Sequence, residues 1–188
     1  MSYDDIVDIA DLDVIYLSYD EPQKEEFWLK IKNMVPWAVR VDGVKGSDAA
    51  HKAAGEASTT ERFILIDGDN MPDENFFNLQ LDFTGLDPNY KLAQYRWRAV
   101  NAINGLRYGN GGMSSWTKTY VANMKTHEHS DGSDTTSVDF CMDYFFSVTC
   151  CGCGSNFVIH IQTSTDNGRI AYSSVHFKSH TACSTRTR

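Results

Sequence analysis

Two aspartates one residue apart give this chain its clearest chemical signal. They are Asp67 and Asp69, separated by Gly68. Like charges a few ångströms apart raise each other's pKa unless a cation joins them. Carboxylate oxygens are the ligands that Mg²⁺ or Mn²⁺ prefers when the ion also bridges to phosphate groups. The pair therefore predicts a divalent metal site, and a plain turn built from Asp-Gly and Asp-Asn steps is the alternative interpretation.

The element that positions these aspartates is the apolar run 63–66, which is rich in β-branched and aromatic residues. Such a run is typical of a strand buried on both faces. Pro72 follows shortly and prevents the strand from continuing. The acids thus lie just beyond the carboxyl end of a central strand, which is where open α/β sheets bind their ligands.

Two strand-helix units are expected before this strand. Their apolar spacing and turn residues predict strands over 11–19 and 37–41 and helices over 23–34 and 49–57, the second helix capped by Ser47 or Asp48. The resulting β-α-β-α-β order predicts an α/β fold with a mostly parallel sheet flanked by helices.

The chain after the acidic pair is less regular. We expect a half-exposed strand over 79–83, another strand over 90–97, a helix or loop over 99–106 and a short helix over 120–124. The glycine cluster 109–112 allows either a close approach to a ligand or a plain hairpin loop.

Composition places broad limits on function. The chain has 188 residues, of which 41% are apolar and 22% charged, and its formal net charge is -8. The negative charge disfavours a general nucleic-acid binder. An acidic N-terminus, unlike that of a signal peptide, and the lack of a long apolar run predict a cytoplasmic protein with no membrane span.

The region 147–188 has a different character. Ser and Thr dominate from Thr163 onward, and the cysteines all fall late, at Cys141, Cys150, Cys151, Cys153 and Cys183. A zinc site and disulfides are two interpretations, although the spacing fits no usual zinc motif and disulfides do not suit a cytoplasm. Our preferred hypothesis is a disordered or truncated tail, or a reading-frame slip, appended to a domain that spans 1–146.

Residues 12–73 resemble the nucleotide-sugar-binding half of a GT-A glycosyltransferase, closest to the family-2-like group. The resemblance rests on a polar loop after the first strand, a helix with small residues, and the acidic pair after the next strand; these residues are Ser18, Tyr19, Asp20, Gly46, Ala50, Ala54, Asp67 and Asp69. The run 44–70 within this stretch is also similar to glycosyltransferase-like proteins of tailed bacteriophages. Residues 74–146 would then form the acceptor half.

The resemblance implies roles for individual residues. Asp69 would bind Mn²⁺ or Mg²⁺ on the donor diphosphate, and Asp67 would contact the donor sugar, its ribose or the metal through water. Tyr19 and Asp20, next to Ser18 in the first loop, would lie by the nucleotide base. His51 or Lys52 would lie near the phosphates or the base.

An inverting enzyme also needs a carboxylate that deprotonates the acceptor hydroxyl. The candidates are Glu128, Asp131 and Asp139, and we favour Asp139 because it begins an apolar segment. No clear Glu-Asp pair follows the glycine cluster, which departs from the usual family pattern. His176 or His180 would be the candidates for a third metal ligand.

The sequence therefore predicts a metal-dependent glycosyltransferase that moves a sugar from a nucleoside diphosphate to an acceptor hydroxyl, in a host cytoplasm if a phage encodes it. A glycan or a modified DNA base would suit as acceptor. One alternative is a non-catalytic nucleotide- or sugar-binding module of the same fold. Another is a haloacid-dehalogenase-like phosphatase, which is less favoured because that family carries its acidic pair after its N-terminal strand.

Overall fold

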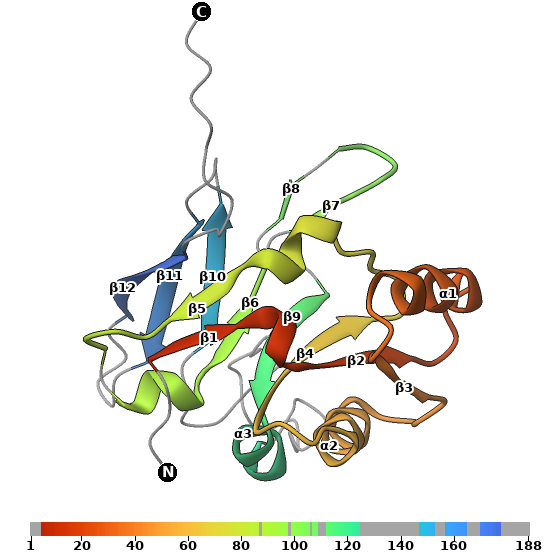
Figure 1. Cartoon of the computed structure of the whole chain (residues 1–188), viewed down its shortest axis with the longest axis horizontal. Helices are drawn as coiled ribbons and strands as arrows, with labels where there is room; N and C mark the ends of the chain where they lie inside the picture. Colours follow the sequence, from red (N-terminus) through yellow and green to blue (C-terminus); the bar gives the residue numbers. More distant parts are fainter. Residues whose placement is uncertain are drawn as a thin grey trace, which may run out of the picture.

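The computed structural model describes residues 5–86, 88–97, 99–105, 107–108, 112–124, 147–152, 157–164 and 170–177. The described part is a mixed α/β fold around an eight-stranded sheet in the order β12-β11-β10-β6-β9-β4-β2-β3 (Figure 1). The strands of this sheet are β2 (Asp13–Ser18), β3 (Val39–Asp42), β4 (Arg62–Asp67), β6 (Gln94–Arg96), β9 (Met113–Thr117), β10 (Ser147–Gly152), β11 (Phe157–Ser164) and β12 (Ile170–Phe177). Two short ladders lie outside it and join β1 (Ile6–Asp8) to β5 (Gln80–Asp82) and β7 (Ala99–Val100) to β8 (Arg107–Tyr108).

The helices connect or follow these strands. They are α1 (Lys24–Met34), α2 (Ser47–Ala57) and α3 (Lys118–Asn123), with 3₁₀ turns η1 (Ile9–Asp11), η2 (Glu74–Asn78) and η3 (Pro88–Leu92). The predicted order strand-helix-strand-helix-strand up to residue 67 is confirmed, with boundaries shifted by one to two residues. The helix over 120–124 is found two residues earlier, as α3.

The sheet is parallel only in part. β3, β2 and β4 run parallel, so that Tyr16 lies opposite Arg40 on one side and Ile66 on the other. β9 is antiparallel to both β4 and β6, while β10 is parallel to β6 and antiparallel to β11. Beyond β4 the described pairs of this sheet are antiparallel except for β6 with β10, so the prediction of a mostly parallel sheet is confirmed only in part. A chain that returns beside a strand without a covering helix forms an antiparallel pair, and this is how β9 joins β6.

Alternation along β2 and β4 divides the core into two clusters. Val14, Tyr16 and Ile66 face α1 and the β1–β5 ladder, whereas Ile15 and Leu65 face α2 and α3. Figure 1 shows α2 and α3 next to each other below the sheet and β1 with β5 in front of it. Every residue of the run 63–66 is fully buried, as predicted for a strand covered on both faces.

The predicted half-exposed strand over 79–83 is confirmed as β5. Leu79, Leu81 and Phe83 are buried, while Gln80 and Asp82 are partly exposed. Its partner is β1 rather than a strand of the main sheet. The predicted strand over 90–97 is shorter, because η3 occupies its first residues and β6 begins at Gln94.

The start of α2 differs from the expectation. Neither Ser47 nor Asp48 is the N-cap residue; both lie inside the helix, and Gly46 precedes them at φ 94° without a side-chain cap. This left-handed backbone region favours glycine, since other residues meet a steric penalty there. Asp48 instead forms an ion pair of 2.7 Å with Lys52 one turn later.

Segments of the region 147–188 form β10, β11 and β12 at one edge of the sheet. The cysteine side chains lie outside the described part, so the zinc, disulfide and reading-frame hypotheses stay predictions. The described helices include none that is long and apolar enough to cross a membrane.

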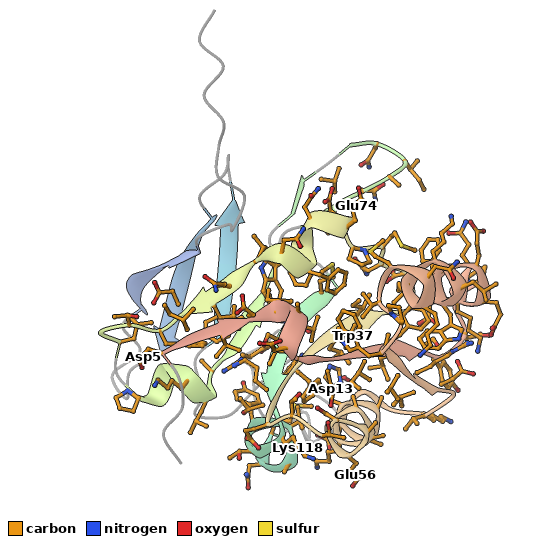
Figure 2. All side chains as sticks on the ribbon, viewed as in Figure 1. Asp5, Asp13, Trp37, Glu56, Glu74 and Lys118 are labelled. Atoms are coloured by element: carbon orange, nitrogen blue, oxygen red, sulfur yellow. The ribbon has the colours of Figure 1, made fainter. Side chains whose placement is uncertain are left out.

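Asp13, the first residue of β2, connects this strand by hydrogen bonds to the turn before β4. Its carboxylate accepts hydrogen bonds from the Thr59 amide at 2.5 Å, the Thr59 hydroxyl at 2.8 Å and the Thr60 amide at 3.1 Å. Figure 2 shows Asp13 and Lys118 at the same lower end of the molecule, where Lys118 Nζ donates to the Ser58 carbonyl at 2.6 Å. The first strand of the sheet is thus tied to the turn that leads into β4.

We expect Asp13→Ala to lower the free energy of unfolding by about 2 kcal/mol, because several donors lose a charged acceptor. Burial raises the pKa of Asp13, but the bonds from Thr59, Thr60 and Ser58 outweigh it and leave the pKa below its usual value. A lowered pKa stabilises the fold at neutral pH, and this contribution disappears as the pH falls through the folded-state pKa. Urea unfolding at neutral and at acidic pH measures both effects; Asp11→Ala, at an exposed acid, is the control.

Candidate functional site

The carboxyl ends of β2, β3 and β4 meet at one edge of the sheet, because these strands run parallel. Leu17 lies opposite Asp67, and Ser18 lies opposite Asp42. A pocket of about 410 Å³ opens at this edge against the first turns of α2. It is lined by Leu17, Ser18, Tyr19, Glu21, Val44, Gly46, Ser47, Ala50, His51, Asp67 and Asp69.

Most of the predicted ligand-binding residues line this pocket. Ser18, Tyr19, His51, Asp67 and Asp69 do so, although they come from three separate parts of the sequence. Two other predicted ligand-binding residues, Asp20 and Lys52, do not line the pocket.

Asp20 is exposed and lies outside the lining, and Lys52 lies on α2 in its ion pair with Asp48. Glu128, Asp131, Asp139 and His180 fall outside the described residues. His176 is on β12, but its side chain is not among those described.

The acidic pair sits on a tight turn after β4. The Asn70 amide donates to the Asp67 carbonyl at 2.9 Å and closes the turn. The Asn70 side chain then donates to Asp69 Oδ1 at 2.6 Å, which orients this second carboxylate. Behind the turn, the Tyr16 hydroxyl lies 2.8 Å from the Gly68 carbonyl. We call Asp67, Gly68, Asp69 and Asn70 the acidic turn.

Two glycines are required beside the acidic turn by space rather than by backbone conformation. A Cβ at Gly68 would overlap the Glu21 carboxylate, and a Cβ at Gly112 would overlap the Asn70 side chain and press on Asp67 Oδ2. Neither glycine has a positive φ. The Gly112 carbonyl also accepts a hydrogen bond from the Asp67 amide at 2.8 Å. The last residue of the glycine cluster 109–112 therefore contacts the acidic turn directly.

The electrostatics of the pocket are dominated by carboxylates. Burial raises the pKa of Asp67 to about 7, with Asp69 and Glu21 adding to the rise and Arg96 opposing it. Burial and the charge of Glu21 also raise the pKa of Tyr16 to about 12, so its hydroxyl stays protonated. A site whose acids disfavour one another's ionisation gains from a bound cation.

Ser18 belongs to an ionic network beside the pocket. Its hydroxyl donates to Asp42 at 2.6 Å and accepts from Arg40 at 3.0 Å. Hydrogen bonds from Lys24 and Ser18 lower the pKa of Asp42 to about 2. Arg40 in turn holds Glu25 through two bonds of 2.7 Å. The network fixes the ends of β2 and β3 against the start of α1.

His51 is a buried wall of the pocket. Its Nδ1 lies 2.7 Å from the Ser47 carbonyl, which only accepts hydrogen bonds, so Nδ1 carries a proton. The ring packs edge-on against Trp116 at a centroid distance of 5.0 Å. These two contacts fix the orientation of the imidazole.

Sequence reasoning gave no site role to Glu21, Asp42 or Arg96, nor to Leu17 and Val44 of the pocket lining, and it did not place Gly112 against the acidic turn. Glu21 and Asp42 follow strand ends and resemble ordinary turn residues in the sequence. Their position at the carboxyl ends of parallel strands is the signal that would have indicated them. Gly112 belongs to the glycine cluster, whose close approach to a ligand was one of the two interpretations, but the acidic turn as its neighbour was not predicted.

Two carboxylates on the acidic turn fit a hard divalent ion. Within the described residues no group of three or more His, Cys, Asp or Glu side chains is arranged to hold a metal. Mg²⁺ often uses only one or two carboxylates and completes its shell with water and substrate phosphates. The carboxylates of Asp67 and Asp69, which both line the pocket, would supply such a partial ligand set.

Comparison with known proteins finds no matching protein-family model, no matching curated protein and no matching solved structure. The resemblance of residues 12–73 to glycosyltransferases therefore rests on the sequence features alone, and the functional argument has to come from the site.

Proposed function

We propose that this protein is a metal-dependent glycosyltransferase of the GT-A type that uses a nucleoside-diphosphate sugar as donor. The observation that carries the proposal is one pocket that joins the acidic turn to the first loop and to the start of α2. Parallel strands β3, β2 and β4 place these elements at one edge, which is the usual ligand position of such sheets.

Asp67 and Asp69 would hold the metal, and Asn70 keeps Asp69 in place. When bound, the metal neutralises charge on the departing nucleoside diphosphate. The described lining of the pocket contains no Lys or Arg. A diphosphate would therefore rely on the cation, and on the amino-terminal end of α2, to offset its charge.

Tyr19, Val44 and Ala50 provide the apolar parts of the wall, beside the polar residues. Tyr19 is half exposed, so that its ring is available to a nucleotide base. Asp139, or Glu128, is retained as the proposed base for the acceptor hydroxyl. The acceptor is a hydroxyl of a glycan or of a modified DNA base.

The proposal is tested by titrating the protein with UDP, GDP, CDP and ADP, with and without Mn²⁺, by calorimetry and thermal unfolding. One nucleoside diphosphate is expected to raise the melting temperature only with Mn²⁺. Asp69→Asn should weaken this binding by at least about tenfold, because it removes a charged metal ligand.

Glu56→Gln is the matched control, since Glu56 is exposed at the far end of α2 (Figure 2). It should leave binding unchanged. A folded protein that binds none of the four nucleotides would refute the proposal. Binding without any sugar hydrolysis or transfer would instead favour the non-catalytic module, and release of inorganic phosphate from a phosphate ester would favour the phosphatase.

A further inference from the structure

Tyr16 connects the core of the sheet to the acidic turn. The residue is fully buried on β2, and its hydroxyl lies 2.8 Å from the Gly68 carbonyl and 3.0 Å from the Lys24 carbonyl. A tyrosine hydroxyl has a single proton, so it donates to one of the two carbonyls. The Gly68 carbonyl is the better acceptor because its contact is shorter and more buried. The core thus donates a hydrogen bond to the peptide between the two aspartates.

The ring of Tyr16 is itself fixed. It stacks on Trp28 at a centroid distance of 5.8 Å and an interplanar angle of 17°. The Arg40 guanidinium lies 5.9 Å from the ring centroid. Because the ring is held by these contacts, its hydroxyl is a hydrogen-bond donor at a fixed position for the Gly68 carbonyl.

The acidic turn needs a donor that holds the Gly68 peptide in place. Asp67 and Asp69 flank Gly68 and repel each other when both are ionised. Rotation of the Gly68 peptide would let the two carboxylates move apart. Gly68 has no side chain to resist this rotation, and the Glu21 carboxylate leaves no room for one.

We propose that Tyr16 is a positioning residue for the metal site, whose hydroxyl holds the Gly68 peptide so that Asp67 and Asp69 converge on one cation. This inference rests on the proposed function for the identity of the cation site. Neighbours that orient metal ligands typically contribute tenfold to a hundredfold in affinity. Tyr16 acts on the ligands through the backbone rather than by touching the metal.

The test is Tyr16→Phe, which removes the hydroxyl and keeps the ring against Trp28. Tyr95→Phe is the matched control, because Tyr95 is equally buried in the same core cluster and does not line the pocket. Mn²⁺ alone is titrated into each protein and free Mn²⁺ is measured by electron paramagnetic resonance. Hydrogen exchange of the Asn70 amide, which closes the turn, is measured without metal.

Tyr16→Phe should bind Mn²⁺ about tenfold more weakly than the wild type. It should also exchange the Asn70 amide on the order of tenfold faster. Tyr95→Phe should change neither quantity, whatever its effect on the melting temperature, whereas Tyr16→Phe should lower the melting temperature by about 3 °C. That pattern separates a positioning role from a general loss of stability.

Unchanged Mn²⁺ affinity and unchanged exchange in Tyr16→Phe would overturn the inference while leaving the proposed function intact. If the wild type binds no Mn²⁺ in the absence of nucleotide, the inferred role of Tyr16 in metal binding is overturned, while the nucleotide titrations still test the proposed function. Faster exchange of the Asn70 amide in Tyr16→Phe would in that case still show that the Tyr16 hydroxyl stabilises the acidic turn. Equal effects of Tyr16→Phe and Tyr95→Phe on Mn²⁺ affinity would also overturn the inference.

Discussion

Replacing Asp67 by asparagine is expected to raise the free energy of unfolding at about pH 8 by about 2 to 4 kcal/mol and to remove Mn²⁺ binding. The wild-type carboxylate must ionise in a partly buried pocket beside Asp69 and Glu21, which is why its pKa rises to about 7. Asparagine keeps the shape and carries no charge. The site would thus gain stability by losing its proposed function.

The sign of the pH dependence follows from the raised pKa of Asp67. Between about pH 4 and pH 7 the folded state holds the proton and the unfolded state does not, so wild-type stability falls as the pH rises. Asp67→Asn lacks this loss, and its advantage should vanish near pH 4.

Urea unfolding at a series of pH values, with and without Mn²⁺, measures the difference. Mn²⁺ should stabilise the wild type but not the variant. Glu56→Gln serves as control, because an exposed acid should not change stability by more than about 0.5 kcal/mol. A variant that is less stable than the wild type at about pH 8 would contradict the argument.

Arg62→Ala is expected to cost about 3 to 5 kcal/mol of stability, because it removes a buried group with several partners. Arg62 is only 7% exposed, and its guanidinium donates to the carbonyls of Lys91 and Ala93 and to the Ser115 hydroxyl. It also lies 4.8 Å from the centroid of Tyr95. Burial lowers the pKa of Arg62 to about 10. Within the described part of the chain no ion pair neutralises it.

Chemical denaturation of Arg62→Ala and Arg62→Lys tests this prediction. Lysine keeps the charge but not the planar fork that spans several acceptors, so it should recover only part of the loss. Lys30→Ala is the control, because Lys30 forms an exposed ion pair with Glu26, which contributes little. A loss below about 1 kcal/mol in Arg62→Ala would show that the carbonyls find water instead.

The first half of the fold was predictable because its apolar pattern is simple. The run 63–66 has no polar residue, and α1 presents Phe27, Ile31 and Met34 at helical spacing. Strand β9 was not predicted, since Ser114 and Ser115 interrupt its pattern. Both serines are buried because they have partners: the Trp116 ring nitrogen donates to Ser114 at 2.6 Å, and Arg62 donates to Ser115 at 3.0 Å.

The site was predictable where chemistry depends on residue type and not where it depends on shape. Asp67 and Asp69 carry a charge pattern that is visible in the sequence. Gly112 acts through the room that it leaves for Asn70, and Glu21 acts through its position over Gly68. Such contacts join residues far apart in the chain and have no local signature.

The position of β9 beside β4 also has a consequence for synthesis of the chain. Every described pocket residue lies in the stretch from Leu17 to Asp69. The ribosome makes this stretch before it makes β9 (Met113–Thr117). Until then β4 has one unpaired edge along a fully apolar run. Such an edge is prone to pair with another nascent chain. A product terminated before Met113 should therefore aggregate, even though it contains the whole described pocket lining.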